Sequence, residues 1–378
     1  MAMQGTESSL TSSQSRVMVV DRGRDFDDMR ARLTAWLEGR MPDATRLVLS
    51  SFSHPVGAGI SNETILFEAE WQESGKPVRQ SYVLRFHPGA HQMFLDPGFE
   101  RQIALIRVLN TGGFPAPRIL WEEHDPAVLG GAFFVMERVR GRVPVSHPVY
   151  NLSGWLFDAP VAMRRTVWED AMAKMAAIHR FEMALLPFLE RPDYGGFGPG
   201  DGFSEEYAYW KAAYAWSSGG REVPMLERAY DWLDANMPAA YETGLAWGDA
   251  RIGNMIFGED GRVRVVLDWE QASLAGGLHD LAWWLVMDAM FSTGIGVARL
   301  DGLGTRDETI ALWKELTGRS TDALLWHEVF ACARGATLVT RQCWLNARPA
   351  PGANPNNNLF TRHLAGAMGW DAPADIDC

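Results

Sequence analysis

Cysteine, long apolar runs and excess positive charge are all scarce in this chain of 378 residues. Three cysteines cannot build a disulfide framework in so long a chain, and none belongs to a Cys-x-x-Cys pair typical of zinc sites. The longest apolar stretches fall far short of the ~20 residues that a transmembrane helix needs. These deficits exclude a disulfide-rich or membrane-spanning class, and we expect a cytoplasmic protein with no membrane partner.

The charge balance argues against a second class of function. Thirty-five Lys and Arg against 47 Asp and Glu give a formal net charge of −12. Binding to a nucleic-acid backbone requires patches of Lys and Arg, so we expect no nucleic-acid partner. The acidic balance suits a cationic small substrate, although it also serves simply to keep a protein in solution.

Hydrophobic residues, by contrast, are plentiful. They make up 47% of the chain, beside 22% charged residues, which is an ordinary balance for a globular protein with a sizeable core. The length allows two to three compact units. Residues 1–20 begin with a segment rich in Ser, Thr and Gln that lacks the apolar region of a signal peptide, and we expect a flexible leader there.

Residues 21–138 have the pattern of a small lobe rich in β-structure. Apolar spacing predicts helices over 25–37 and 99–109. β-branched and aromatic runs predict strands, and a turn containing Gly57, Gly59 and Asn62 separates the first two. The predicted strands cover residues 47–52, 64–69, 81–86, 118–121 and 132–139.

Residues 139–378 have the pattern of a larger, mainly helical lobe. Two short strands, 255–257 and 263–267, form a hairpin within an otherwise loop-like segment at 245–270. A Pro/Asn loop over 349–358 is followed by a short tail. The expected fold class is therefore α+β, with a small antiparallel sheet joined through a hinge near 136–142 to a helical lobe. Helical periodicity predicts helices at 161–181, 203–216, 225–233, 278–290, 307–316 and 322–345.

The densest polar cluster lies in the segment 245–270. Asn254 enters the first strand of the hairpin and Asp268 ends the second, so both can converge on one hard cation such as Mg²⁺. Asp249 lies nearby as a carboxylate that can orient a hydroxyl and accept its proton. Arg251 can reach a transferring phosphoryl group. Each residue alone is also an ordinary turn residue, but the combination favours phosphoryl transfer.

These motifs resemble the aminoglycoside phosphotransferase family of kinase-like enzymes, which includes choline, homoserine and fructosamine kinases. They read Trp-Gly-Asp-Ala-Arg-Ile-Gly-Asn at 247–254, Val-Leu-Asp-Trp-Glu at 266–270 and Asp-Leu-Ala at 280–282. The branch of the family that the sequence most resembles occurs in actinobacteria and is fused to some acyl-CoA dehydrogenases. The resemblance covers residues 45–290, including the segments 59–63, 82–85, 114–118 and 136–138.

The resemblance implies a two-lobed protein-kinase-like fold with ATP bound at the hinge. Asp249 would then be the catalytic base, Arg251 would share the charge that develops on the transferring phosphoryl group, and Asn254 and Asp268 would be ligands of Mg²⁺. Other residues would bind the nucleotide. Backbone groups near Gly57, Gly59, Ser61 and Asn62 would cover the phosphates, Arg85 would contact them, and Glu137 and Val139 would face the adenine.

The resemblance also implies a small-molecule acceptor with a hydroxyl group. An aminoglycoside such as kanamycin is the best candidate, which would make the protein an antibiotic-resistance enzyme. A hydroxyacyl compound or another metabolite is the alternative acceptor. A nucleotide-binding pseudokinase without turnover is the alternative function.

Departures from the family pattern motivate that last alternative. Arg85 occupies the position of a phosphate-binding Lys, and a planar guanidinium places phosphate differently from an ammonium. The family has a Glu on the next helix as the partner of this cation, and here either Gln102 or Glu100 occupies that position; Gln102 would replace the ion pair by a hydrogen bond. Trp247 replaces a His that acts as a scaffold in kinases. The loop 274–277 also lacks the family's Gly-Asp-Pro.

Several further polar residues have both a functional and a structural interpretation. Glu270 could contact substrate or metal, or be an ordinary surface or buried acid. Asp280 is expected to cap a helix and to brace the catalytic loop. His179 is expected to be a buried, hydrogen-bonded histidine. Three tryptophans could wall a substrate cleft, although packing explains them better: Trp210, Trp283 and Trp284. Three acids could attract ammonium groups, although a solvated helix start explains them better: Asp201, Glu205 and Glu206.

Overall fold

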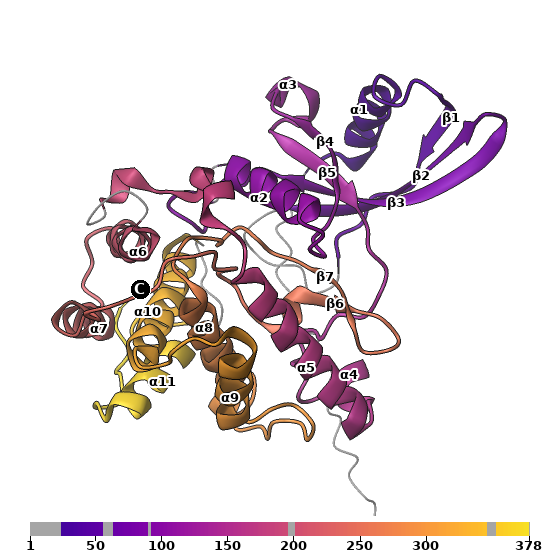
Figure 1. Ribbon diagram of the computed structural model, residues 1–378. Coiled ribbons are helices and arrows are strands. Elements are labelled where there is room, and N and C mark those ends of the chain that lie inside the picture. Colours follow the sequence, from indigo (N-terminus) through magenta and orange to yellow (C-terminus); the bar gives the residue numbers. More distant parts are fainter. Residues whose placement is uncertain (1–23, 56–62, 90–91, 196–200, 346–352, 378) are drawn as a thin grey trace, which may run out of the picture.

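The computed structural model describes residues 24–55, 63–89, 92–195, 201–345 and 353–377. A β-sheet lobe lies against a larger helical lobe, as the expected fold class requires (Figure 1). The last strand of the sheet lobe, β5 (Phe133–Glu137), ends next to the expected hinge. We retain the division at 138/139 as a proposal. The expected leader at 1–20 lies outside the described residues.

The sheet of the smaller lobe has five antiparallel strands in the order β1-β2-β3-β5-β4. Side chains alternate between its faces, so Tyr82, Leu84 and Phe86 of β3 pack toward α1 while Val83 packs toward α2. Arg85 therefore shares the face of Val83. The bounds are α1 Phe26–Glu38, β1 Ala44–Leu49, β2 Thr64–Glu73, β3 Lys76–Phe86, α2 Phe99–Thr111, β4 Ile119–Glu123 and α3 Pro126–Leu129.

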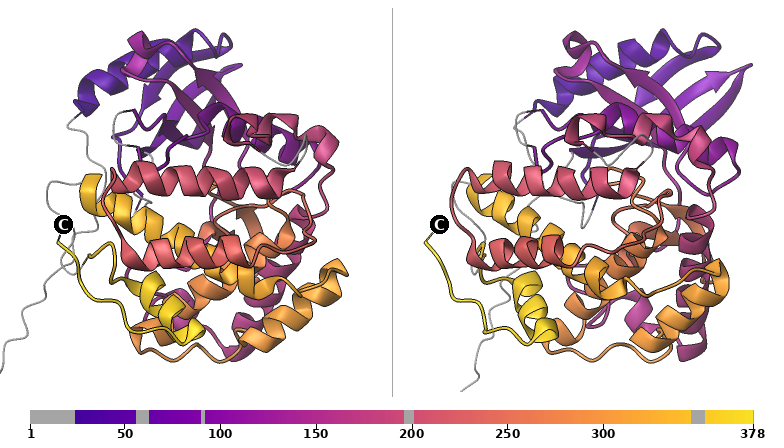
Figure 2. Two further views of the ribbon diagram at one scale, coloured as in Figure 1. Left: turned by 90° about the vertical axis from the view of Figure 1, so that its left-hand side faces the viewer. Right: turned by 60° about the vertical axis from the view of Figure 1, so that its left-hand side comes forward.

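The helical lobe is built around α10 (Leu324–Leu345), which is buried on most of its sides. Helix α8 (Gly277–Met290) packs along it, and α6 (Gly202–Ser218) and α7 (Pro224–Ala235) cross over it in Figure 2. The remaining helices are α4 Trp155–Asp158, α5 Val161–Ile178, α9 Arg306–Thr317 and α11 Leu359–Met368, with single 3₁₀ turns at Met183–Leu185, Pro187–Leu189, Pro192–Tyr194, Ile252–Asn254 and Thr293–Ile295.

Most sequence-based elements lie within a few residues of their predicted positions. The hairpin strands are β6 (Met255–Phe257) and β7 (Val263–Val266). The prediction was wrong for the C-terminal region, where a tail was expected and α11 is present. Strand β5 is also shorter than predicted, and Val139 follows it as irregular chain.

The β6–β7 hairpin is tied both to the chain that follows the hinge and to the sheet lobe. Arg142 exchanges two backbone hydrogen bonds with Phe257, and the N–H of Val266 donates to the carbonyl of Pro115. These contacts place the loop 245–254 and the residues after β7 beneath the sheet lobe. They fix the polar segment 245–270 at the boundary between the lobes.

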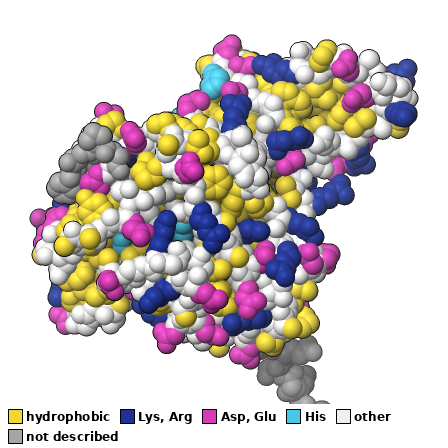
Figure 3. All heavy atoms as spheres, in the orientation of Figure 1, with side chains coloured by type: hydrophobic (Ala, Val, Ile, Leu, Met, Phe, Trp, Pro, Cys, Tyr) yellow, Lys and Arg dark blue, Asp and Glu magenta, His cyan; other side chains and the backbone are white. Residues whose placement is uncertain are grey.

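The surface carries both signs of charge. On the face shown in Figure 3, Lys and Arg side chains are interspersed with Asp and Glu rather than gathered into one basic patch. Within the described ranges, no helix combines the length and the apolar character that crossing a membrane requires.

Candidate active site

Asp249 is held by three side-chain donors. Its Oδ1 accepts from Nε1 of Trp283 at 2.7 Å, and its Oδ2 accepts from Nδ2 of Asn254 at 2.6 Å and from Nε of Arg251 at 3.2 Å. An ionised carboxylate offers about four lone-pair directions, so one direction on Oδ1 stays available for a further donor. The carboxylate is therefore rigidly placed while one of its oxygens can still accept a hydroxyl proton.

Asn254 and Asp268 present oxygen atoms to the same cavity. Both donated bonds of Asn254 start from Nδ2 and end on Asp249, which leaves Oδ1 of Asn254 as the atom for a cation. Asp268 has a left-handed backbone with φ of +63°, a conformation that costs free energy in a non-glycine residue and often occurs at functional sites. That turn directs the Asp268 side chain away from β7 toward the cavity, which both residues line.

These two residues suit Mg²⁺ only in combination with other ligands. Among the described residues, no three His, Cys, Asp or Glu side chains are grouped closely enough to hold a metal by themselves. Mg²⁺ in nucleotide-binding sites typically takes one or two protein oxygens and completes its shell with phosphate oxygens and water. The amide oxygen of Asn254 and the carboxylate of Asp268 fit that pattern.

Arg85 reaches from β3 to the residues that follow β7. One of its terminal nitrogens, Nη2, donates to Oδ1 of Asp268 at 3.0 Å and to Oε2 of Glu270 at 2.9 Å. Burial opposes the positive charge, but the two carboxylates outweigh it and raise the pKa of Arg85 above its ordinary value. The Nε of Arg85 is buried and has no hydrogen-bond partner among the described residues.

Neither expected partner of Arg85 on α2 makes that contact. Glu100 lies on the surface, where it pairs with His124 at 3.1 Å. Gln102 is buried and lines the cavity, but Arg85 forms its ion pairs with Asp268 and Glu270. The acidic partners of Arg85 therefore come from the helical lobe in this chain.

The backbone of the loop before Asp249 is fixed by Asp280 of α8. The buried Asp280 carboxylate accepts from the N–H groups of Trp247 at 2.7 Å and Gly248 at 2.8 Å, and from Nε2 of His179 at 2.9 Å. This confirms the expected brace and the buried, bonded His179. The expected helix cap was wrong, because α8 begins at Gly277 and Asp280 lies inside its first turn.

Trp247 acts as a scaffold through both its backbone and its ring. The side chain is fully buried, and its Nε1 donates to the carbonyl of Leu267 at 2.8 Å. Leu267 directly precedes Asp268, so one indole ties the loop of Asp249 to the segment of Asp268. This contact gives Trp247 the scaffold role expected for the residue at that position.

Arg334 of α10 supports the same loop from the inside of the helical lobe. It is fully buried, its Nη2 donates to the carbonyl of Gly248 at 2.9 Å and to Oε1 of Gln271 at 3.1 Å, and its guanidinium stacks on the ring of Trp283. Burial lowers the pKa of Arg334. Sequence reasoning missed Arg334, although a single arginine inside the apolar run 329–340 was a visible signal.

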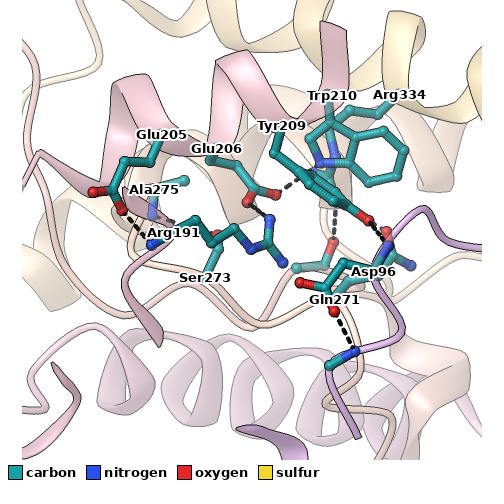
Figure 4. Close-up of polar contacts among 12 residues, drawn as sticks. Asp96, Arg191, Glu205, Glu206, Tyr209, Trp210, Gln271, Ser273, Ala275 and Arg334 are labelled. Carbon is teal, nitrogen blue, oxygen red and sulfur yellow. Dashed lines mark hydrogen bonds and ion pairs between the residues drawn. The ribbon is translucent and has the colours of Figure 1, made fainter. Parts of the chain in front are cut away.

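The acidic residues at the start of α6 are not a solvated cluster. Asp201 accepts from the N–H of Ser204 as a helix cap, whereas Glu205 and Glu206 are buried. Glu206 forms an ion pair with Arg191, and Glu205 accepts from the N–H of Arg191 at 2.8 Å (Figure 4). The expectation of a solvated helix start was therefore wrong for both glutamates, whose neighbouring cation belongs to the protein itself.

A cavity of about 340 Å³ lies between the lobes, beside the residues described above. Its roof comes from the sheet and α2, its floor from the β6–β7 hairpin, and its side from the hinge segment 137–143. The residues that line it include Leu66, Val83, Arg85, Gln102, Phe134, Met136, Glu137, Val139, Arg251, Asn254 and Asp268.

The hinge offers few free backbone donors. The N–H of Glu137 donates to the carbonyl of Arg118, and the N–H of Arg138 donates to that of Ser81. The N–H of Val139 donates to no other backbone group in the described part of the chain. Gly57, Gly59, Ser61 and Asn62, the residues expected over the phosphates, lie outside the described residues.

The fold is that of kinase-like phosphotransferases, and comparisons with known proteins agree. Residues 54–318, well over half of the chain, match the phosphotransferase enzyme family. The chain therefore belongs to this family of small-molecule phosphotransferases.

Individual relatives show how far the likeness extends. The human acyl-CoA dehydrogenase family member 11 is 28% identical over 279 residues, which are 71% of this chain and 33% of the human protein. The chain thus spans about a third of the length of such relatives. A Ralstonia eutropha protein assigned to the aminoglycoside phosphotransferases has 24% identity and a TM-score of 0.62, with 90% of this chain and 96% of that chain covered. An ethanolamine kinase of Plasmodium vivax has 12% identity and a TM-score of 0.54, with 84% of this chain and 82% of that chain covered.

Proposed function

We propose that the protein transfers the γ-phosphate of ATP, with Mg²⁺, to a hydroxyl group of a small molecule. The observation that carries this proposal is that Arg85, Arg251, Asn254 and Asp268 line the cavity between the lobes, and that the carboxylate of Asp249 is hydrogen-bonded to two of them, Arg251 and Asn254. Phosphoryl transfer asks a protein mainly for positioning and for stabilisation of charge, and this set supplies both.

In this mechanism Asp249 orients the acceptor hydroxyl and takes its proton. The open lone pair on Oδ1 accepts the hydroxyl hydrogen while Trp283 and Asn254 hold the carboxylate in place. The hydroxyl oxygen forms a bond to the γ-phosphorus, the bond from that phosphorus to the bridging oxygen breaks, and ADP leaves with the bond's electron pair. Arg251 and Arg85 contribute positive charge beside the transferring group.

Other residues hold the nucleotide. Asn254 and Asp268 would bind Mg²⁺, which neutralises negative charge on the β- and γ-phosphates when bound. Glu137 and Val139 would face the adenine, with the N–H of Val139 as a donor to a ring nitrogen. The turn with Gly57, Gly59, Ser61 and Asn62 would cover the phosphates, where backbone N–H groups can approach closely.

The acceptor is a choice between two chemical classes. An aminoglycoside such as kanamycin would need exposed acids, but Glu205 and Glu206 are buried and lie against Arg191. The relatives named as acyl-CoA dehydrogenases favour a hydroxyacyl compound instead. We therefore rank a hydroxyacyl thioester above an aminoglycoside.

Release of ADP from Mg²⁺-ATP tests the proposal directly. The panel of acceptors should contain hydroxyacyl thioesters, kanamycin, choline and amino sugars, with the Asp249→Asn protein as the blank. Acceptor-dependent release above the blank supports the proposal and identifies the acceptor class. Nucleotide binding without release for any member of the panel would favour the pseudokinase instead.

A further inference from the structure

Arg85 is shared by two acids that lie two residues apart. Its Nη2 contacts Oδ1 of Asp268 and Oε2 of Glu270 at nearly equal distances, 3.0 and 2.9 Å. The side chain of Glu270 is 6% exposed, against 22% for Asp268. Glu270 is thus the more enclosed member of the pair, and Asp268 is the one that opens toward solvent and the cavity.

This arrangement creates a conflict if Asp268 also binds Mg²⁺. The oxygen that accepts from Arg85 is one of the two that a cation would use, and a guanidinium next to a bound cation is repelled by it. Arg85 must then leave Asp268 at least in part. A released arginine on a flexible side chain loses its placement unless a second carboxylate holds it.

No carboxylate on α2 can take over that role. Gln102 and Ile106, the residues of α2 that line the cavity together with Arg85, carry no charge, and Glu100 is engaged at the surface with His124. The buried Nε of Arg85, by contrast, has no partner among the described residues and is a donor that remains for a phosphate oxygen.

We propose that Glu270 is the positioning residue that holds Arg85 toward the phosphates while Asp268 turns to the metal. This inference depends on the proposed function of the site. Glu270 performs the task from the helical lobe that an acid on α2 would perform from the sheet lobe. Asp268 and Glu270 then divide the work, one binding the cation and the other anchoring the arginine.

The inference predicts that the Mg²⁺ requirement depends on Glu270 only through Arg85. In Glu270→Gln, Arg85 retains Asp268 as its acid and competes with Mg²⁺ for it. The Mg²⁺ concentration that gives half-maximal binding of the ATP analogue AMP-PNP should rise about tenfold, which corresponds to ~1.4 kcal/mol. In Arg85→Met the competitor is absent, and adding Glu270→Gln should change that concentration by less than about twofold.

Calorimetric titration of AMP-PNP at a series of MgCl₂ concentrations measures this cycle without any acceptor. The control is Glu68→Gln, which breaks an ion pair with Arg79 in the sheet lobe, away from Arg85, and should have no effect. An equal rise with and without Arg85 would make Glu270 a metal ligand and overturn the inference. An unchanged Mg²⁺ requirement in Glu270→Gln would overturn it as well.

A rescue experiment separates positioning from general damage to the site. Gln102→Glu adds a carboxylate on α2 beside the same cavity. In the Glu270→Gln background it should reverse at least half of the rise in the Mg²⁺ concentration that gives half-maximal binding of AMP-PNP. Failure of that rescue would contradict the positioning role. If Glu270→Gln does not fold, Glu270→Asp keeps the charge, shortens the reach and should shift the requirement in the same direction by a smaller factor.

The same titrations distinguish a failure of the proposed function from a failure of the role given to Glu270. If the wild-type protein does not bind AMP-PNP with Mg²⁺ at all, the proposed function fails. If the wild-type protein binds it and the cycle shows no coupling between Arg85 and Glu270, only the role of Glu270 fails.

Discussion

Asp280 offers the sharpest test of how the catalytic loop is held in place. Its carboxylate is fully buried and accepts three hydrogen bonds, from the N–H groups of Trp247 and Gly248 and from His179. Asp280→Ala leaves these three buried donors without their acceptor. Each such loss costs about 1–3 kcal/mol, and losses in one network are not additive.

The expected total is about 3–5 kcal/mol of unfolding free energy, the range for breaking a buried charged contact. Asp280→Asn should cost less, about 1–3 kcal/mol, since its amide oxygen can still accept from Gly248. The amide nitrogen of this variant, however, would face the N–H of Trp247, so two donors would meet there. The same amide nitrogen would also face Nε2 of His179, so His179 would have to carry its proton on Nδ1, which is buried without a partner among the described residues.

Urea denaturation of the wild type and both variants measures these differences. Asp158→Ala is the control, because Asp158 is exposed and its loss should change the free energy by less than about 0.5 kcal/mol. A cost below about 1 kcal/mol for Asp280→Ala would refute the brace, as would equal costs for alanine and asparagine.

Three further predictions address the base, the turn and one buried histidine. Trp283→Phe removes one donor to Asp249 and should lower kcat about tenfold to a hundredfold with AMP-PNP affinity unchanged, whereas Trp313→Phe, which removes a buried N–H without a partner among the described residues, should leave kcat alone. Gly248→Ala would place Cβ 2.0 Å from the carbonyl oxygen of Gln271 at a φ of +90°, and should cost more than about 3 kcal/mol in urea denaturation, against about 1 kcal/mol for Gly296→Ala, where that atom meets open space. Burial and then Arg334 lower the pKa of His327 to about 3, so the folded protein keeps this histidine neutral while the unfolded chain binds a proton below about pH 6.5. Stability from this group is present above pH 6.5 and is lost as the pH falls toward 3, by up to ~1.4 kcal/mol per pH unit; His327→Leu should flatten the decline between pH 6.5 and 5, and equal slopes would contradict the assignment.

The sequence was most informative where a pattern has a direct physical cause. Strands of the sheet lobe alternate between two covered faces, and the period of two made them visible at nearly their true positions. Helix α11 was missed because the preceding Pro/Asn segment suggested a loop. Its cap, in which Asn358 and Thr361 bond each other's backbone, was a usable signal.

Side-chain partners between distant segments were much harder to predict. Glu205 and Glu206 were predicted to be solvated because charged residues at the start of a helix are usually exposed. No local sequence pattern indicated that Arg191 is their buried neighbour. Trp283 follows Asp280 by three residues, so both lie on one face of α8. That spacing was available, but the position of Asp249 opposite this face is decided by tertiary packing.

The partner of Arg85 illustrates the same limit within the site. The comparison with kinases directed attention to α2, where the sequence provides Glu100 and Gln102. The structure supplies Asp268 and Glu270 instead, from a segment about 185 residues further along the chain. Residue types and their local spacing predicted which groups gather at the cavity, whereas the pairing among them required the fold.

The most direct test of the account separates phosphate transfer from nucleotide binding at Asp249. With an accepting hydroxyl compound identified, phosphorylated product should be measured by mass spectrometry for the wild type and Asp249→Asn, beside AMP-PNP binding by calorimetry. The account predicts that Asp249→Asn abolishes product formation and leaves AMP-PNP affinity within about threefold of the wild type. Product formation at wild-type rates, or an equal loss of transfer and binding, would contradict the role of Asp249 as the base.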